Sequence, residues 1–345
     1  MAAELHPDVD AAARRLARSP ELPLLRLKRL SRLPGPAFGL AWGLLIFVIV
    51  MEPFFTLDMN AGQQREVLGS ALFFGTSIAI LTGGAAPVFY GVAGDLRQLG
   101  AVLGVKADLH EDLVQGLTRA TRAQVVTTLC IGILGGCMHS LLLGHQRLPI
   151  FVLIPQIFGT VTLWVFMVMT LTKLIINALV FSRLGAVAEP DLLRPSRHAG
   201  FGTAALRPAL FIVGTLCAYL LLFIGDGQPR NDAVWIGASM SLLALVGTFT
   251  LPLRGIRRRI SRRREEILAD LDDRIEGLAD TNLASVPAAT LRDMDTILDM
   301  RERVAQAPGW PLDLAGVKRI LLYIVLPPLT WAAAALVEMM IDALV

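Results

Sequence analysis

Cysteine is rare in this 345-residue chain, and its three copies all fall inside long apolar runs. Cys130 and Cys137 lie seven residues apart, which places them on one face of a helix, where they could approach Cys217. A small secreted domain held by disulfides is excluded, because such a domain needs cysteine pairs outside the membrane. We interpret the three cysteines as small apolar packing residues.

Signatures of catalysis and cofactor binding are also missing. The sequence contains no phosphate-binding loop, nucleophile elbow, HExxH motif, paired CxxC or dinucleotide fingerprint. The five histidines are scattered along the chain, which argues against a histidine metal site. Asp270, Asp272 and Asp273 lack the glycine turn of a cation loop, so we interpret them as a solvated helix face. We expect no catalytic residue, metal or cofactor, and a membrane enzyme is the third choice of function.

Apolar residues, by contrast, make up 54% of the chain, and the mean hydropathy is +0.59. This composition is too apolar for an ordinary soluble protein. About 20 apolar residues cross a bilayer, and seven runs are long enough. The sequence therefore predicts an all-α polytopic membrane protein with spans at Ala37–Phe55, Val67–Val92, Ala123–Leu143, Pro149–Phe181, Pro208–Ile224, Ala233–Leu253 and Ile320–Leu344.

Positive charge is almost absent from every second loop between these spans. Those loops hold only Arg65, Arg147 and Arg230, whereas 28 of the 32 lysines and arginines lie in segments 1–36, 93–122, 182–207 and 254–319. Cytoplasmic loops carry the excess of positive charge. We therefore expect a cytoplasmic N-terminus and an outer C-terminus. The usage of alanine, leucine and arginine is typical of bacteria, so we expect a bacterial inner membrane protein.

These features divide the chain into four predicted regions. They are a basic amphipathic N-terminal segment (1–36), a six-helix membrane region (37–253), a cytoplasmic helical hairpin (254–312) and a final span (313–345). Leucines alternate with arginines in the N-terminal segment, which is typical of a helix in the membrane interface. Binding of a partner helix is the alternative for this segment.

The net charge of the hairpin region changes from positive to negative along its length. Seven arginines, which we call the basic collar, fall between Arg254 and Arg264, and eleven carboxylates then face four arginines between Glu265 and Gln306. Helical spacing of the apolar residues, with a break at Thr281–Asn282 and Pro287 at a first helical position, predicts two helices. The first should continue the sixth span, because no breaker lies between Arg257 and Ala279.

The basic collar is expected to bind anionic lipid headgroups rather than nucleic acid, because no folded soluble module presents a basic face. The residues assigned to headgroup binding are Arg257, Arg258, Arg259, Arg262, Arg263 and Arg264. A homo-oligomer and a cytoplasmic protein partner are also expected.

A few polar residues inside or beside the spans are candidates for a solute pathway or an outer vestibule, because charged groups in a membrane face protein or water. They are Glu52, His139, Gln156, Lys173, Asn177, Glu338 and Asp342. The alternatives are an interfacial Glu52, a structural His139 and a Lys173 that snorkels to the surface. Pro87, Pro327 and Pro328 are expected to break or hinge their helices, with close packing of small residues as the alternative around Pro87.

Three motifs near the C-terminus carry a resemblance to known sequences. They are LPLRGIRRRI from Leu251, GWPLD from Gly309 and RILLYIVLPPLTW from Arg319. Over roughly the last hundred residues the chain resembles a class of bacterial polytopic membrane proteins without an assigned chemistry. The resemblance implies bacterial origin and this architecture, and no activity.

Two functions agree with this pattern. The first is a homo-oligomeric channel or transporter for small solutes, plausibly cations, because seven outer carboxylates face three arginines and would concentrate cations. In that function the hairpin controls gating or assembly. The second is a membrane-anchored signalling or scaffold protein whose hairpin docks a cytoplasmic partner.

Overall fold

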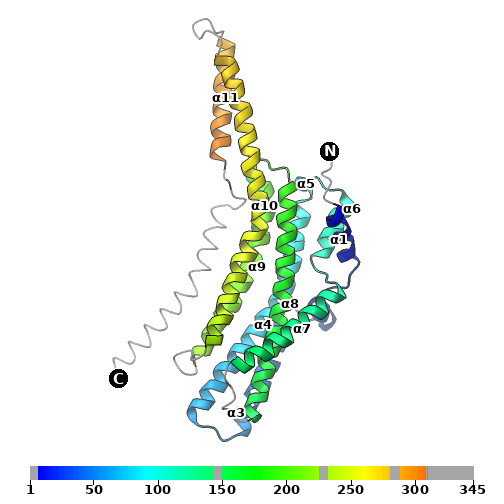
Figure 1. The fold of residues 1–345 in the computed structure, drawn as a ribbon, viewed down its shortest axis with the longest axis vertical. Helices are drawn as coiled ribbons and strands as arrows, with labels where there is room; N and C mark the ends of the chain where they lie inside the picture. Colours follow the sequence, from blue (N-terminus) through cyan, green and yellow to red (C-terminus); the bar gives the residue numbers. More distant parts are fainter. Residues whose placement is uncertain (1–6, 143–149, 225–231, 280–287, 308, 310–345) are drawn as a thin grey trace, which may run out of the picture.

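The computed structural model describes residues 7–142, 150–224, 232–279, 288–307 and 309, and the long elements of this part are all helices (Figure 1). In chain order they are α1 (Pro7–Ala17), α2 (Pro23–Ser31), α3 (Gly35–Thr56), α4 (Ala61–Gln98), α5 (Gly100–Leu103), α6 (Ala107–Gly116), α7 (Arg122–Leu142), α8 (Ile150–Val187), the 3-10 turn η2 (Pro195–His198), α9 (Ala199–Ala218), the 3-10 turn η3 (Tyr219–Ile224), α10 (Asp232–Ala279) and α11 (Ala288–Gln306).

Six helices in this part of the chain are long and apolar enough to cross a membrane. They are α3, α4, α7, α8, the segment Pro195–Ala218 that joins η2 to α9, and Ser239–Gly277 within α10. The all-α class predicted from the sequence is therefore confirmed for the described residues, which include six candidate membrane spans. The seventh predicted span, with Pro327, Pro328, Glu338 and Asp342, lies outside the described residues.

One predicted span boundary and one predicted helix break were wrong. The fifth span does not begin at Pro208, because α9 begins at Ala199 and Pro208 lies inside it. Nor does Pro87 break α4, which continues to Gln98. The fourth run extends beyond the bilayer length, since α8 reaches Val187.

Helices α3 and α4 lie in close contact along a row of small residues. Gly39 faces Gly83, and a Cβ added at Gly39 would lie 2.7 Å from the Cα of Gly83. Gly43 meets Gly75 in the same way, with 2.5 Å to its carbonyl oxygen. Small residues at every fourth position let membrane helices approach closely. The alternative for the region around Pro87, close packing, is therefore confirmed at Gly83.

The third span uses glycine similarly. A Cβ at Gly132 would lie 2.7 Å from the Cα of Val165 on α8, and one at Gly136 would lie 2.6 Å from the Cα of Val161. The opposite face of α7 is exposed and includes Cys130 and Cys137. The packing role expected for these two cysteines is therefore wrong, because the helix turns its glycines toward α8 instead.

The N-terminal segment folds onto the end of the bundle from which α10 emerges (Figure 1). Helix α1 packs against α6, and Leu24 and Leu25 of α2 are buried, 2% and 1% exposed. Leu27, Leu30 and Leu33 remain exposed. One face of the segment thus binds protein, and the apolar residues left on α2 are available to an interface.

Candidate functional site

Lys173 and Asn177 lie four residues apart on one buried face of α8, each 3% exposed. The Nζ of Lys173 donates to the carbonyl oxygens of Gly116 at 2.7 Å and Arg119 at 2.6 Å. Nδ2 of Asn177 donates to the carbonyl oxygen of Leu117 at 3.1 Å. The last carbonyls of α6 lack partners within their own helix, and a lysine satisfies them well. The snorkelling expected for Lys173 is therefore wrong.

The same connection between α6 and α7 is held from its other side by the N-terminal segment. The N–H of Leu22 donates to the carbonyl of Thr118 at 3.0 Å, and the N–H of Ala120 donates to that of Pro20 at 3.1 Å. The Arg119 guanidinium donates to the carbonyl of Ala17. Lys173 and Asn177 therefore belong to a structural clamp.

The other candidate pathway residues are not brought to this clamp. Gln156 is buried on α8, 2% exposed, but 17 residues of helix, roughly 25 Å, separate it from Lys173. His139 of α7 is half-buried against Trp164, with ring centroids 5.6 Å apart. Glu52 is exposed near the end of α3. The described candidates thus occupy separate places in the bundle.

An ion pair that the sequence did not reveal joins α4 to α9. Nε of Arg207 donates to Oδ2 of Asp95 at 2.9 Å, and Nη2 donates to Oδ1 at 3.3 Å. Asp95 is 3% exposed, whereas the Arg207 side chain is 47% exposed. The two residues lie 112 positions apart. This pair fixes the fifth span against the second.

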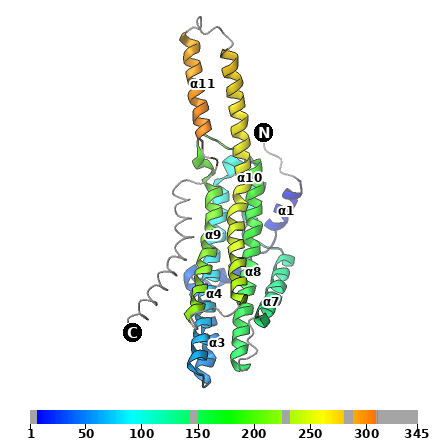
Figure 2. The same ribbon diagram turned by 60° about the vertical axis from the view of Figure 1, so that its left-hand side comes forward.

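The helix α10 extends well beyond the bundle and pairs with α11 to form the hairpin arm, here residues 254–279 and α11 (Figures 1 and 2). The predicted continuity of the sixth span with the first hairpin helix is confirmed, since α10 passes through Pro252. The predicted break at Thr281–Asn282 and Pro287 lie outside the described residues.

Little of the hairpin arm is buried, and what is buried lies at its base and between its two helices. Ile260, Leu271 and Val304 are 4%, 5% and 1% exposed. Arg301 of α11 donates to Asp272 of α10 at 2.5 Å, and this bond raises the pKa of the guanidinium. Most of the remaining described surface of the arm is charged and open to solvent.

The arginines of the basic collar lie in different environments. Arg254, Arg257, Arg258 and Arg262 line one groove of about 620 Å³ beside Leu251 and Leu253. Outside this groove, Arg259 donates to the carbonyl of Ala188 at 3.3 Å, and Arg263 pairs with Glu266 at 3.2 Å.

No protein-family model, curated protein or solved structure matches this chain. The arrangement of the described residues is therefore the basis for a function. It offers two features beyond structural pairing, the charged hairpin arm and an arginine groove at its base.

Proposed function

We propose that this multi-pass membrane protein is a docking platform, in which the hairpin arm binds a basic partner on the cytoplasmic side of the membrane. The observation that carries the proposal is the continuity of α10 over 48 residues. At 1.5 Å per residue this helix is about 72 Å long, more than twice the ~30 Å hydrocarbon core. The arm is thus held rigidly by a membrane span.

The charge of the hairpin arm beyond the basic collar supports a basic occupant. Residues 265–306 carry a net charge of −7. Two copies of this acidic part would repel each other, whereas a basic helix would be attracted to it. Leu298 and Met300 are 45% and 43% exposed on α11 and offer apolar contacts among these charges.

The alternative is the homo-oligomeric channel or transporter for small cations. Docking is favoured over transport because Asp95, Lys173 and Arg207, charged groups within the described bundle, are each engaged by protein groups. The two functions separate in one experiment. The full chain reconstituted in liposomes should not accelerate K⁺ flux above that of empty vesicles. Flux that falls in Glu52→Gln would establish the channel instead.

Partner binding itself is tested by a photoreactive amino acid at position 298. We expect a crosslink in cells to one basic protein, which is lost when Asp293 and Asp295 are both changed to Lys. The matched control places the same photoreactive residue at Leu243, which is 72% exposed on the membrane part of α10. A crosslink to a second copy of this chain, or one unaffected by the charge reversal, would contradict the proposed partner.

Separation of the two arm helices has a specific expected effect. Val304→Asp should detach α11 from α10 and greatly increase cleavage of the arm by protease, because an unpaired carboxylate cannot replace a valine that is 1% exposed. Leu298→Asp on the exposed face should leave the cleavage rate unchanged. Equal cleavage of the two variants would show that the helices do not depend on this contact.

Anionic lipid binding at the groove is a second part of the proposal. Arg254→Gln with Arg258→Gln should weaken binding to phosphatidylserine nanodiscs by about 2 kcal/mol at low salt, since each charge contributes about 1 kcal/mol. Arg259→Gln with Arg263→Gln removes the same charge from arginines that have protein partners, and should weaken binding less. Binding is measured with the full chain reconstituted in nanodiscs that contain increasing fractions of phosphatidylserine, from the fluorescence of a labelled phosphatidylserine near the groove. Equal losses in the two double variants would contradict a groove-specific site.

A further inference from the structure

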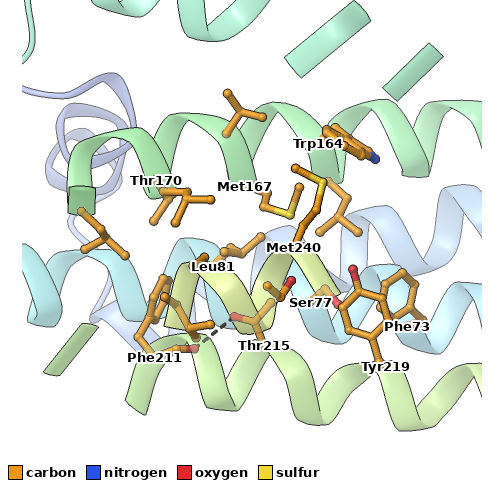
Figure 3. A pocket seen from close by; sticks show the side chains of 17 residues that line it. Phe73, Ser77, Leu81, Trp164, Met167, Thr170, Phe211, Thr215, Tyr219 and Met240 are labelled. Carbon is orange, nitrogen blue, oxygen red and sulfur yellow. Dashed lines mark hydrogen bonds between the residues drawn. The ribbon is translucent and has the colours of Figure 1, made fainter. Parts of the chain in front are cut away.

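A cavity of about 100 Å³ lies between helices in the membrane region (Figure 3). Its walls come from α4, α8, α9, η3 and α10, and they include Phe73, Trp164, Phe211 and Met240. The lining is almost wholly apolar, apart from a few hydroxyl groups. An apolar cavity of this kind binds small molecules rather than water.

Two of these hydroxyls have no hydrogen-bond partner. Ser77 on α4 is 0% exposed and Thr170 on α8 is 2% exposed, and neither Oγ of Ser77 nor Oγ1 of Thr170 is bonded. Both residues line the cavity. Other lining hydroxyls are satisfied, since Thr215 donates to the carbonyl of Phe211 at 3.1 Å and Tyr219 bonds Ser241.

Buried hydroxyls elsewhere in the spans follow a different pattern. Thr82, Ser140 and Thr160 each donate to the carbonyl four residues earlier, at 2.7, 2.8 and 2.9 Å. This internal bond is the usual way for a membrane helix to satisfy a hydroxyl. A buried hydroxyl without a partner costs about 1–3 kcal/mol. Ser77 and Thr170 are therefore available to a bound polar atom.

The size and the edge of the cavity limit the occupant. Its volume is about two-thirds of an engineered cavity of ~150 Å³ that accepts benzene, so it encloses only a few heavy atoms. Met240 at its edge is 49% exposed and, being unbranched, can move aside. A short polar head fits inside, and an apolar tail can extend past Met240.

We propose that the cavity binds a small neutral alcohol whose hydroxyl bonds to one of the two unpartnered hydroxyls, Ser77 or Thr170, and whose carbon chain lies against the aromatic wall. Met240, Ser241 and Ala244 belong to α10. The ligand therefore contacts the helix that carries the hairpin arm. This site does not depend on the docking function, because no arm residue lines it.

The test uses a butanol that carries a diazirine at its third carbon, added to the full chain in nanodiscs and activated by light. Mass spectrometry should locate the adduct on cavity residues, and excess 1-butanol should suppress it. Ser77→Ala with Thr170→Val should reduce labelling about fivefold, the effect of losing roughly one hydrogen bond's free energy. Diazirine-bearing butane, without the hydroxyl, should label weakly.

Thr82→Val is the matched control, because Thr82 is buried on α4 and bonded within its own helix, outside the cavity wall. It should lower the Tm and leave labelling unchanged, whereas the double variant should keep its Tm, since it removes unbonded hydroxyls. Adducts outside the cavity, equal labelling by the butane probe, undiminished labelling of the double variant, or its unfolding would each overturn the proposal.

Discussion

Replacing Gly255 with alanine is expected to destabilise the protein more than any other single methyl addition to α10. A Cβ at this position would overlap the backbone carbonyl of Ser182 on α8 and would lie 2.9 Å from the N of Ala186. Gly185 makes the reciprocal contact, with 2.5 Å to the N of Ile256. Backbone atoms cannot move as a side chain can, so α8 and α10 must separate.

Overpacking usually costs 1–3 kcal/mol, and we expect about 3 kcal/mol or more here. The measurement is the Tm of the detergent-solubilised chain, followed by size-exclusion chromatography after heating. Gly247→Ala and Gly277→Ala are matched controls on the same helix, because nothing lies within 4 Å of a Cβ at either position. Both should be neutral or slightly stabilising, since alanine favours a helix. A tolerated Gly255→Ala would contradict the close crossing.

The sequence predicted most of the membrane helices because bilayer thickness fixes the length of an apolar run. The start of the fifth span was predicted at Pro208, whereas α9 begins at Ala199 and Pro208 lies more than two helical turns into it. Helices α5 and α6 were not predicted at all. They are short, and α6 shows its amphipathic pattern only through Leu109, Leu113 and Val114.

The candidate site was less predictable than the fold. The four-residue spacing of Lys173 and Asn177 is enough to place them on one helix face, but the carbonyl groups that they bond lie outside α8 and carry no side-chain signal in the sequence. The pairing of Asp95 with Arg207 depends on the register of two helices that are 112 residues apart. Ser77 and Thr82 are both hydroxyl residues in the apolar part of α4, so the sequence alone does not show that Ser77 lacks a hydrogen-bond partner whereas Thr82 has one.

Loss of Arg207 is the second substitution with a large expected effect. Arg207→Leu leaves Asp95, which is 3% exposed, as a buried carboxylate without its partner. Breaking a buried pair in this way costs about 3–5 kcal/mol. Asp95→Asn should cost less, because the Arg207 side chain is 47% exposed and can extend to water.

The double variant Asp95→Asn with Arg207→Leu decides whether the effect is electrostatic. If the unpaired charge causes the loss, this variant should recover most of the Tm lost by Arg207→Leu alone, and the cycle should yield a large coupling. Arg207 also packs its stem on Gly91, where a Cβ would lie 3.0 Å from Cδ, so Arg207→Lys tests the forked geometry separately. Lysine keeps the charge but loses the two-point contact, so the Tm of this variant should lie between those of the wild type and Arg207→Leu. A double variant as unstable as Arg207→Leu would instead assign the loss to packing of the arginine stem.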